Sequence, residues 1–357
     1  MVQRLLFLLP FFLAILPQLP AQDAPTTQTI TLLQQAPPLR GITLPLFAWY
    51  QDYDYGPHIV EIAATGANSL NITFSLVQEN ANSTWMAKRK GRSPSDATLR
   101  QTIRQARQAG LNVFLLPIVV LHDSRDGDWR GNLQPNSLDA WFANYELWIA
   151  HYARLAESEG VAIFGVGSEF ASLEQHTDRW KALINKVRRV YSGKLTYSCN
   201  WDHLHGPEGW WSDLDYVGLS SYYELTENPN ATQEELNAGW LKWRQFVFDW
   251  KNTHAPTIPL LFTEVGYPSM DGGAVFPWDY TLDKPRDWEE QAMAYRAFMQ
   301  TWDATPEVEG VYFYKWVSFA EEELGYSPKG KPAEVLLREW FATNILGGPD
   351  PGPQQKP

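Results

Sequence analysis

The chain has 357 residues, 44% of them hydrophobic and 20% charged, a balance typical of a globular protein with one large domain or two ordinary ones. Its 29 basic and 41 acidic residues leave a net charge of −12, which disfavours general binding to nucleic-acid phosphates. The single cysteine, Cys199, excludes an internal disulfide scaffold and any multi-cysteine metal or iron–sulfur site.

Residues 1–21 have the pattern of a secretory signal peptide. Arg4 precedes an apolar run from Leu5 to Leu16, and the segment ends at Ala21. The run is shorter than the roughly 20 apolar residues of a membrane-spanning helix, and an uncleaved membrane anchor is the alternative interpretation. We therefore expect a secreted or periplasmic protein that has no membrane partner after the signal is cleaved.

The rest of the chain divides by composition into a linker, one folded domain and a tail. Residues 22–40 are rich in Gln, Thr and Pro and are predicted to form the linker, whereas residues 344–357 are predicted to be a disordered tail. The folded domain is expected over residues 41–343, because that span contains no Pro/Gly-rich linker and no sharp change of composition.

Within this domain, short runs that are apolar on both faces alternate with longer amphipathic stretches. Runs of the first kind are typical of buried parallel strands, and they begin near Ile42, Ser69, Asn112, Ala162, Lys194, Asp215, Pro259 and Gly310. The stretches between them predict helices over Asp96–Gly110, Leu138–Glu159, Asp178–Tyr191, Glu234–Thr253 and Trp288–Asp303. Eight strands with intervening helices predict a single (β/α)8 barrel. A doubly wound open sheet is the alternative, but no glycine-rich turn follows the first strand.

Carboxylates follow two of the predicted strands at the point where a barrel places its catalytic groups. The fourth strand ends at Ser168-Glu169, and the seventh ends within Thr263-Glu264-Val265. An isolated buried carboxylate is costly, and salt-bridged or capping glutamates are the structural alternative. Two such residues on strands four and seven favour a catalytic pair.

Other strand ends carry amide, hydroxyl and aromatic side chains. Trp49 closes the first strand, Asn200 and Trp201 the fifth, Tyr222 the sixth and Trp316 the eighth. Two carboxylates with polar groups and rings suit glycoside hydrolysis, since acids act on the bond and rings stack on sugar faces. The 17 tryptophans of the chain agree with a carbohydrate ligand.

Competing chemistries have weaker signals. Asp202, His203 and His205 offer metal-ligand types, but a loop with this spacing more often makes hydrogen bonds, and we expect neither a metal nor a cofactor. Cys199 is expected to be a small buried side chain rather than a nucleophile. A non-catalytic carbohydrate-binding barrel and a secreted esterase or metallopeptidase remain alternatives, as does a glycosidase for another β-glycan.

The strand ends resemble those of the clan A (β/α)8 glycoside hydrolases, and the chain as a whole resembles glycoside hydrolase family 113, the β-1,4-mannanase family. The stretches that carry the resemblance include Pro94-Ser95-Asp96, Trp129-Arg130-Gly131, Gly167-Ser168-Glu169-Phe170, Asn200-Trp201-Asp202, Leu214-Asp215-Tyr216 and Phe262-Thr263-Glu264-Val265. The resemblance implies a retaining hydrolase of β-linked polysaccharide or oligosaccharide, with Glu169 as acid/base and Glu264 as nucleophile. It also implies Asn200, Trp201, Tyr222 and Trp316 as cleft residues.

Two positions depart from the pattern that the resemblance suggests. Many clan relatives have Asn before the acid, where Ser168 stands here, and a serine reaches less far toward a sugar hydroxyl. The third strand reads Pro117 to Leu121, an apolar end where the mannanase-like pattern has a His and an Asp, and this departure predicts altered substrate contacts. For the pair itself, we expect a raised pKa for Glu169 and a low one for Glu264, with about 5–5.5 Å between the carboxyl groups. A monomer is expected.

The signal peptide provides the first testable prediction. Because Leu5–Leu16 forms a short apolar run behind Arg4, a signal peptidase should cleave the exported chain close to Ala21. N-terminal sequencing of the exported protein measures this directly. A mature chain that still begins at Met1 would identify the segment as an anchor.

Overall fold

The computed structural model describes residues 37–46, 52–125, 127–205, 209–317 and 324–343. All of them belong to one compact unit that begins at Pro37. Its first strand starts at Leu39, so the last two residues of the predicted linker lie in the sheet. The predicted signal peptide and tail lie outside the described residues.

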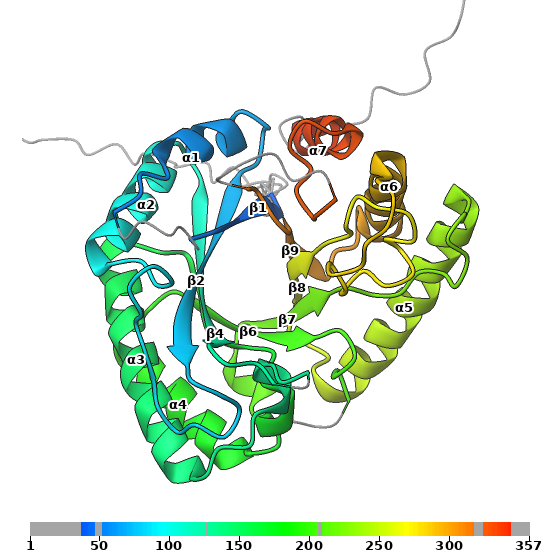
Figure 1. Cartoon of the computed structure of the whole chain (residues 1–357). Helices are drawn as coiled ribbons and strands as arrows, with labels where there is room; N and C mark the ends of the chain where they lie inside the picture. The colour runs from blue at the N-terminus through cyan, green and yellow to red at the C-terminus, as the bar shows by residue number, and fades with distance from the viewer. Residues whose placement is uncertain (1–36, 47–51, 126, 206–208, 318–323, 344–357) are drawn as a thin grey trace, which may run out of the picture. The chain divides into compact units, whose positions relative to one another are not determined.

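Eight parallel strands form a closed barrel (Figure 1). Closure is seen in the first strand, which pairs with both the second and the last. The barrel strands are β1 (Leu39–Pro45), β2 (Ser69–Gln78), β4 (Asn112–Leu121), β5 (Ile163–Ser168), β6 (Lys194–Asn200), β7 (Tyr216–Ser221), β8 (Leu260–Val265) and β9 (Val308–Phe313). A two-residue strand, β3 (Met86–Ala87), pairs antiparallel with the end of β2. The predicted (β/α)8 barrel is confirmed.

Helices surround the barrel. They are α1 (Gly56–Ala63), α2 (Asp96–Gln108), α3 (Leu138–Glu159), α4 (Thr177–Arg188), α5 (Gln233–His254), α6 (Trp288–Trp302) and α7 (Pro332–Ala342), with short 3-10 turns η1 (Arg130–Asn132), η2 (Ala171–Leu173) and η3 (Trp211–Asp213). Five of the seven α-helices match those predicted to within a few residues, while α1 and α7 were not predicted.

Local capping explains several helix limits. The Ser95 side chain accepts a hydrogen bond from the Thr98 amide at the start of α2, and Thr232 and Glu235 form a reciprocal capping box at the start of α5. The long helix α3 ends at Gly160, whose φ of 63° is in the left-handed region that glycine adopts without strain. These signals are all local, which is why the sequence predicts those limits well.

Apolar side chains fill both the inside of the barrel and the layer between strands and helices. The inner cluster consists of Phe114, Leu116, Ile118, Ile163, Tyr216, Leu261 and Tyr312. Alternate residues of the same strands face the helices and join a much larger cluster. Close packing extends to the backbone: a Cβ on Gly218 would come within 2.3 Å of the Tyr197 carbonyl oxygen. The core therefore positions the carboxyl ends of the strands rigidly.

The strands β2 and β4 are longer than the others and stay paired along their whole length. Their register runs from Ser69 opposite Asn112 to Gln78 opposite Leu121. The backbone bonding continues beyond them, since the amides of His122 and Asp123 donate to the carbonyls of Gln78 and Glu79. This extension builds one wall above the barrel mouth.

Candidate active site

Glu169 stands directly after β5 with an unusual backbone. Its φ is 55°, a left-handed conformation that costs a non-glycine residue about 1–2 kcal/mol. Its amide donates to the Ser198 carbonyl at 2.8 Å, and the residue is 4% exposed. Strained backbone of this kind is held in place by its surroundings and clusters at functional sites.

Two donors from other segments hold the Glu169 carboxylate. The Arg130 guanidinium, at the start of η1, forms an ion pair with Oε2. The Ser220 hydroxyl, on β7, donates to Oε1 at 2.5 Å. Both carboxylate oxygens are therefore bonded, and charge-assisted bonds of this type are stronger than neutral ones.

Glu264 lies on β8 and is 3% exposed. Its Oε2 accepts a hydrogen bond from the Tyr222 hydroxyl at 2.6 Å. In the sheet, Glu264 is the register partner of Ser220, the residue that donates to Glu169. The barrel thus brings the two predicted catalytic carboxylates to one place, on either side of Ser220.

The electrostatics of Glu264 differ from what we expected. Burial raises the pKa of Glu264 to about 7, and the neighbouring charge of Glu169 adds to the rise. The Tyr222 hydroxyl, Arg130 and Lys315 lower it, but they do not outweigh burial. The expectation of a low pKa for Glu264 is therefore wrong. The physical reason is the burial of Glu264, whose direct hydrogen-bond donor is the neutral Tyr222 hydroxyl while Arg130 pairs directly with Glu169.

Arg130 is the cation that both carboxylates share. Burial works against its charge, yet the fields of Glu169 and Glu264 outweigh this and raise the pKa of the Arg130 guanidinium. Burial together with Glu264 also raises the pKa of Tyr222 well above its usual value, so the phenol stays protonated and donates. The arrangement is a buried pair of acids with one shared counterion and one fixed hydroxyl donor.

Trp316, predicted as a cleft ring, follows β9 and is 1% exposed. Its indole N–H donates to Glu61 Oε2 at 2.9 Å, and its backbone amide donates to the Thr43 carbonyl. The Lys329 ammonium lies 5.7 Å from the ring centroid. The ring is therefore fixed by contacts from both ends of the chain.

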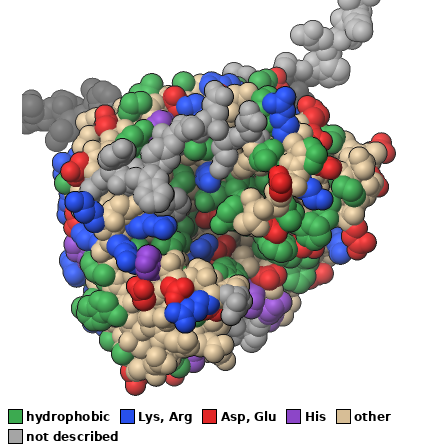
Figure 2. All heavy atoms as spheres, in the orientation of Figure 1, with side chains coloured by type: hydrophobic (Ala, Val, Ile, Leu, Met, Phe, Trp, Pro, Cys, Tyr) green, Lys and Arg blue, Asp and Glu red, His purple; other side chains and the backbone are tan. Residues whose placement is uncertain are grey.

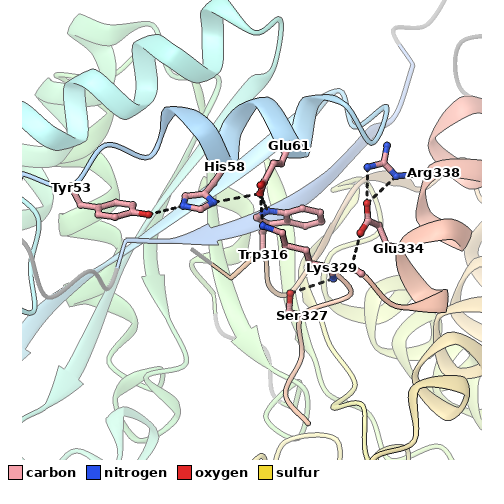
Figure 3. Close-up of polar contacts among 9 residues, drawn as sticks. Tyr53, His58, Glu61, Trp316, Ser327, Lys329, Glu334 and Arg338 are labelled. Carbon is pink, nitrogen blue, oxygen red and sulfur yellow. Dashed lines mark hydrogen bonds and ion pairs between the residues drawn. The ribbon is translucent and has the colours of Figure 1, made fainter. Parts of the chain in front are cut away.

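Glu61 organises the contacts around that ring, as Figure 3 shows. It comes from α1 and also accepts from Lys329 at 2.7 Å and contacts His58 at 3.4 Å. The Tyr53 hydroxyl in turn bonds to His58 at 2.8 Å. Although burial acts in the opposite direction, the donors Lys329 and Trp316 lower the pKa of Glu61. Glu61 therefore stays charged and holds Trp316 in one orientation.

The remaining predicted residues have separate surroundings. Asn200 donates to Asp202 at 2.6 Å. Trp201 packs edge-on against Tyr223 and Trp243, each with a ring-centroid distance of 5.9 Å. The Ser168 hydroxyl is fully buried and, among the described residues, has no hydrogen-bond partner. Trp49 lies outside the described residues.

The third barrel strand ends later than its sequence suggested. β4 runs to Leu121, so His122 and Asp123 follow it directly, and the apolar stretch that we took as its end lies within the strand. The predicted departure from the mannanase-like pattern at this strand end is therefore wrong, because a His and an Asp do follow the strand. Asp123 forms an ion pair with Arg125 at 2.6 Å.

Several residues of the site were not predicted. Arg130 was noted only as part of a motif, and Ser220, Lys315 and Glu61 were given no role. The signal available for Arg130 was its place in Trp129-Arg130-Gly131, one of the stretches that carry the resemblance. Nothing in the sequence alone paired it with Glu169.

The described residues give little support to the other kinds of site. Among the described residues, no group of three His, Cys, Asp or Glu side chains is placed to hold a metal ion. Cys199 is buried, with its thiol 3.6 Å from the Asn200 carbonyl oxygen. None of the helices described is long and apolar enough to cross a membrane.

Comparison with known proteins identifies the family. The model of Glycoside Hydrolase Family 113 matches residues 49–329, which is most of the chain. The chain belongs to Glycoside Hydrolase Family 113. Its activity class is accordingly that of a glycoside hydrolase. A comparison with curated protein sequences found no match.

Solved structures of the family have the same fold. The chain is 27% identical to the GH113 β-mannanase AaManA from Alicyclobacillus acidocaldarius in complex with ManMIm, with a TM-score of 0.75 over 86% of this chain and 98% of that one. A GH113 β-1,4-mannanase in a complex is 23% identical, with the same TM-score, over 86% and 99% of the two chains. The fold is shared by a GH5_18 enzyme from Streptomyces cattleya in complex with Manβ1-4GlcNAc. That enzyme is 15% identical, with a TM-score of 0.62, over 89% of this chain and 83% of that one.

The raised pKa of Glu264 predicts how stability depends on pH. A carboxyl whose pKa rises on folding favours the folded state below its ordinary pKa, and this contribution is lost as the pH rises through about 7. The variant Glu264→Gln should therefore gain stability over the wild type at pH 8.5, with an upper limit on the order of 3 kcal/mol. At pH 4.5 the difference should be small.

Urea unfolding at both pH values measures the effect. Glu227→Gln is the matched control, because Glu227 is exposed on a loop and its substitution should change stability little at either pH. A Glu264→Gln variant with the same difference from wild type at both pH values would contradict the raised pKa.

Proposed function

We propose that this family 113 protein is an exported β-1,4-mannanase that cleaves by a retaining double displacement. Glu169 is the acid/base and Glu264 the nucleophile. The observation that carries the proposal is the buried pair of carboxylates at the ends of β5 and β8, with Arg130 as their shared counterion. Export rests on the signal pattern of residues 1–21.

The proposed reaction assigns each carboxylate a separate task. Glu264 attacks the anomeric carbon and forms a glycosyl ester, while Glu169 gives its proton to the leaving oxygen. Glu169 then takes a proton from water, which attacks the same carbon and releases the ester. The Tyr222 hydroxyl bonded to Glu264 orients the oxygen of the nucleophile during both steps.

This reaction needs a proton on Glu169 and a charge on Glu264, whereas burial raises the pKa of Glu264 and Arg130 pairs with Glu169. A substrate must therefore bind together with a change in this ion pair. A shift of the guanidinium toward Glu264 would release Glu169 to hold a proton and would stabilise the charge of the nucleophile. The field of Arg130 already acts on both carboxylates.

Mannan is the substrate best supported. The 27% identical relative is a β-mannanase. His122 and Asp123 follow the third barrel strand directly, which removes the departure from the mannanase pattern predicted there. Ser168, which stands before the acid, is fully buried, so its short side chain exposes no atom to the sugar. A panel of soluble mannan, glucan and xylan, assayed for new reducing ends, tests the assignment. Release from mannan alone is the expected result.

The roles proposed for Glu264 and Glu169 predict different losses of activity when each is replaced by alanine. Glu264→Ala should abolish turnover, and added azide should restore part of it as the glycosyl azide of opposite anomeric configuration. Glu169→Ala should impair substrates with poor leaving groups far more than activated aryl glycosides, because only the former need the proton. Proton NMR of the first-formed product checks the mechanism. An inverted anomer would refute the assigned roles even if both residues proved essential.

Arg130 should set the acid limb of the pH–rate profile. Arg130→Gln removes a positive charge that lowers the pKa of Glu264, so the acid limb of kcat/KM should move to higher pH by about one unit. Arg130→Lys keeps the charge and should move the limb less. Equal losses of activity in both variants, with no movement of the limb, would restrict Arg130 to a packing role.

A further inference from the structure

The loop between β8 and α6 leaves three aromatic side chains exposed within five residues. Phe276 is 46%, Trp278 48% and Tyr280 70% exposed. Only five large aromatic side chains are exposed among the described residues, the other two being Trp85 and Phe246. Because most aromatic side chains in the described part of the chain are buried, such a cluster indicates a binding surface. In Figure 2, hydrophobic side chains gather beside the central hollow, over the region where this loop lies in Figure 1.

The base of this loop is rigid. The Asp271 amide donates to the Pro285 carbonyl at 2.8 Å, and the Asp287 amide donates to the Ser269 carbonyl at 3.0 Å. The carboxylate of Glu290, at the start of α6, accepts from the amides of Gly272 and Ala274 at 2.8 and 2.9 Å. A loop tied in this way loses little conformational entropy when it binds a ligand.

The aromatic segment itself is also anchored. The Trp278 indole N–H donates to Glu224 Oε1 at 3.0 Å, and the Tyr326 hydroxyl donates to the Pro277 carbonyl at 2.7 Å. Trp278 therefore keeps a fixed orientation although nearly half of it is exposed. A ring held by its edge and left open to solvent is suited to stacking on a flat ligand.

The exposed segment is continuous with the catalytic pair. The ring of Tyr280 contacts that of Tyr326 with a centroid distance of 6.1 Å, and Tyr326 contacts Tyr222 at 5.6 Å. Tyr222 is the residue whose hydroxyl donates to Glu264. A row of rings therefore leads from the proposed nucleophile to the surface of the loop.

The chemistry of the segment selects the ligand class. Its rings are neutral, and the carboxylates beside them, Glu224 and Asp279, are hydrogen-bonded to Trp278 and Thr281. Negative charges next to the rings disfavour an anionic polymer, whereas the apolar faces of pyranose rings stack on aromatic side chains. The ligand that fits is a neutral β-linked polysaccharide.

We propose that Phe276, Trp278 and Tyr280 form an aromatic platform that binds sugar residues of a neutral β-linked polysaccharide away from the cleavage point. The proposal rests on the proposed function, since it extends the same site along the polymer. The platform would make the enzyme prefer long polysaccharide substrates over short ones, through the β8–α6 loop.

Kinetics with mannooligosaccharides of increasing length test the platform. For Trp278→Ala, the ratio of kcat/KM between a hexasaccharide and the shortest oligosaccharide that the wild type cleaves should fall at least fivefold. Trp278→Phe keeps a ring and should restore part of the ratio. Phe246→Ala, which removes an exposed ring from α5, should leave the ratio unchanged. A ratio that is the same in Trp278→Ala and wild type would overturn the proposal while the proposed function stands.

Affinity electrophoresis in gels that contain mannan, glucan or xylan separates the two proposals. If the wild type binds one polymer without cleaving any, the proposed function fails, and weaker retardation of Trp278→Ala still supports the platform. If the wild type neither binds nor cleaves any of the three polymers, the proposed function and the platform proposal both fail. Sedimentation of the wild type and of Trp278→Ala tests whether the rings bind a second copy of the protein instead. If the wild type is a dimer, the variant is a monomer and the two are retarded equally by the polysaccharide, the rings serve self-association and the platform proposal is overturned.

Discussion

Closure of the barrel is the constraint on which the site depends. Because β1 pairs with both β2 and β9, the carboxyl ends of eight strands meet around one opening. Residues that are far apart in the chain then share a small volume. Ser220 illustrates this, since it is the register partner of Glu264 and also donates to Glu169. An open sheet would place the ends of β5 and β8 on a line, three strand positions apart.

The same closure places two like charges close together in a buried site, where a third charge must offset their repulsion. Two carboxylates, 3–4% exposed, oppose each other's charge, and burial penalises both. One guanidinium, Arg130, compensates them unequally, because its direct bond goes to Glu169. Glu264 consequently titrates near neutrality. Toward the surface of the β8–α6 loop, the buried acids give way to exposed aromatic side chains. The proposed platform continues the row of ring contacts that begins at Tyr222. The buried rings of Tyr222 and Tyr326 thus connect the acids to the exposed rings of the loop.

The sequence alone determined the fold and the two catalytic candidates. Strands begin at Ser69, Asn112 and Lys194, as predicted, because runs that are apolar on both faces are a local signal of buried strands. The helix Leu138–Glu159 was predicted to the residue, since its limits coincide with Ser137 and Gly160, which cap it. Glu169 and Glu264 could be found because a charged residue after an apolar run marks the end of a barrel strand.

Only the tertiary structure decided what surrounds these carboxylates. Arg130 reaches Glu169 across 39 positions, and Glu61 holds Trp316 across 255. Such pairs depend on strand register and on loop paths, neither of which leaves a periodic pattern in the sequence. The end of β4 was misjudged for a related reason: an apolar run does not show where pairing stops, and Leu121 is within the strand because β2 continues to Gln78. The pKa of Glu264 likewise follows from burial and from its neighbours in space, which the order of residues does not contain.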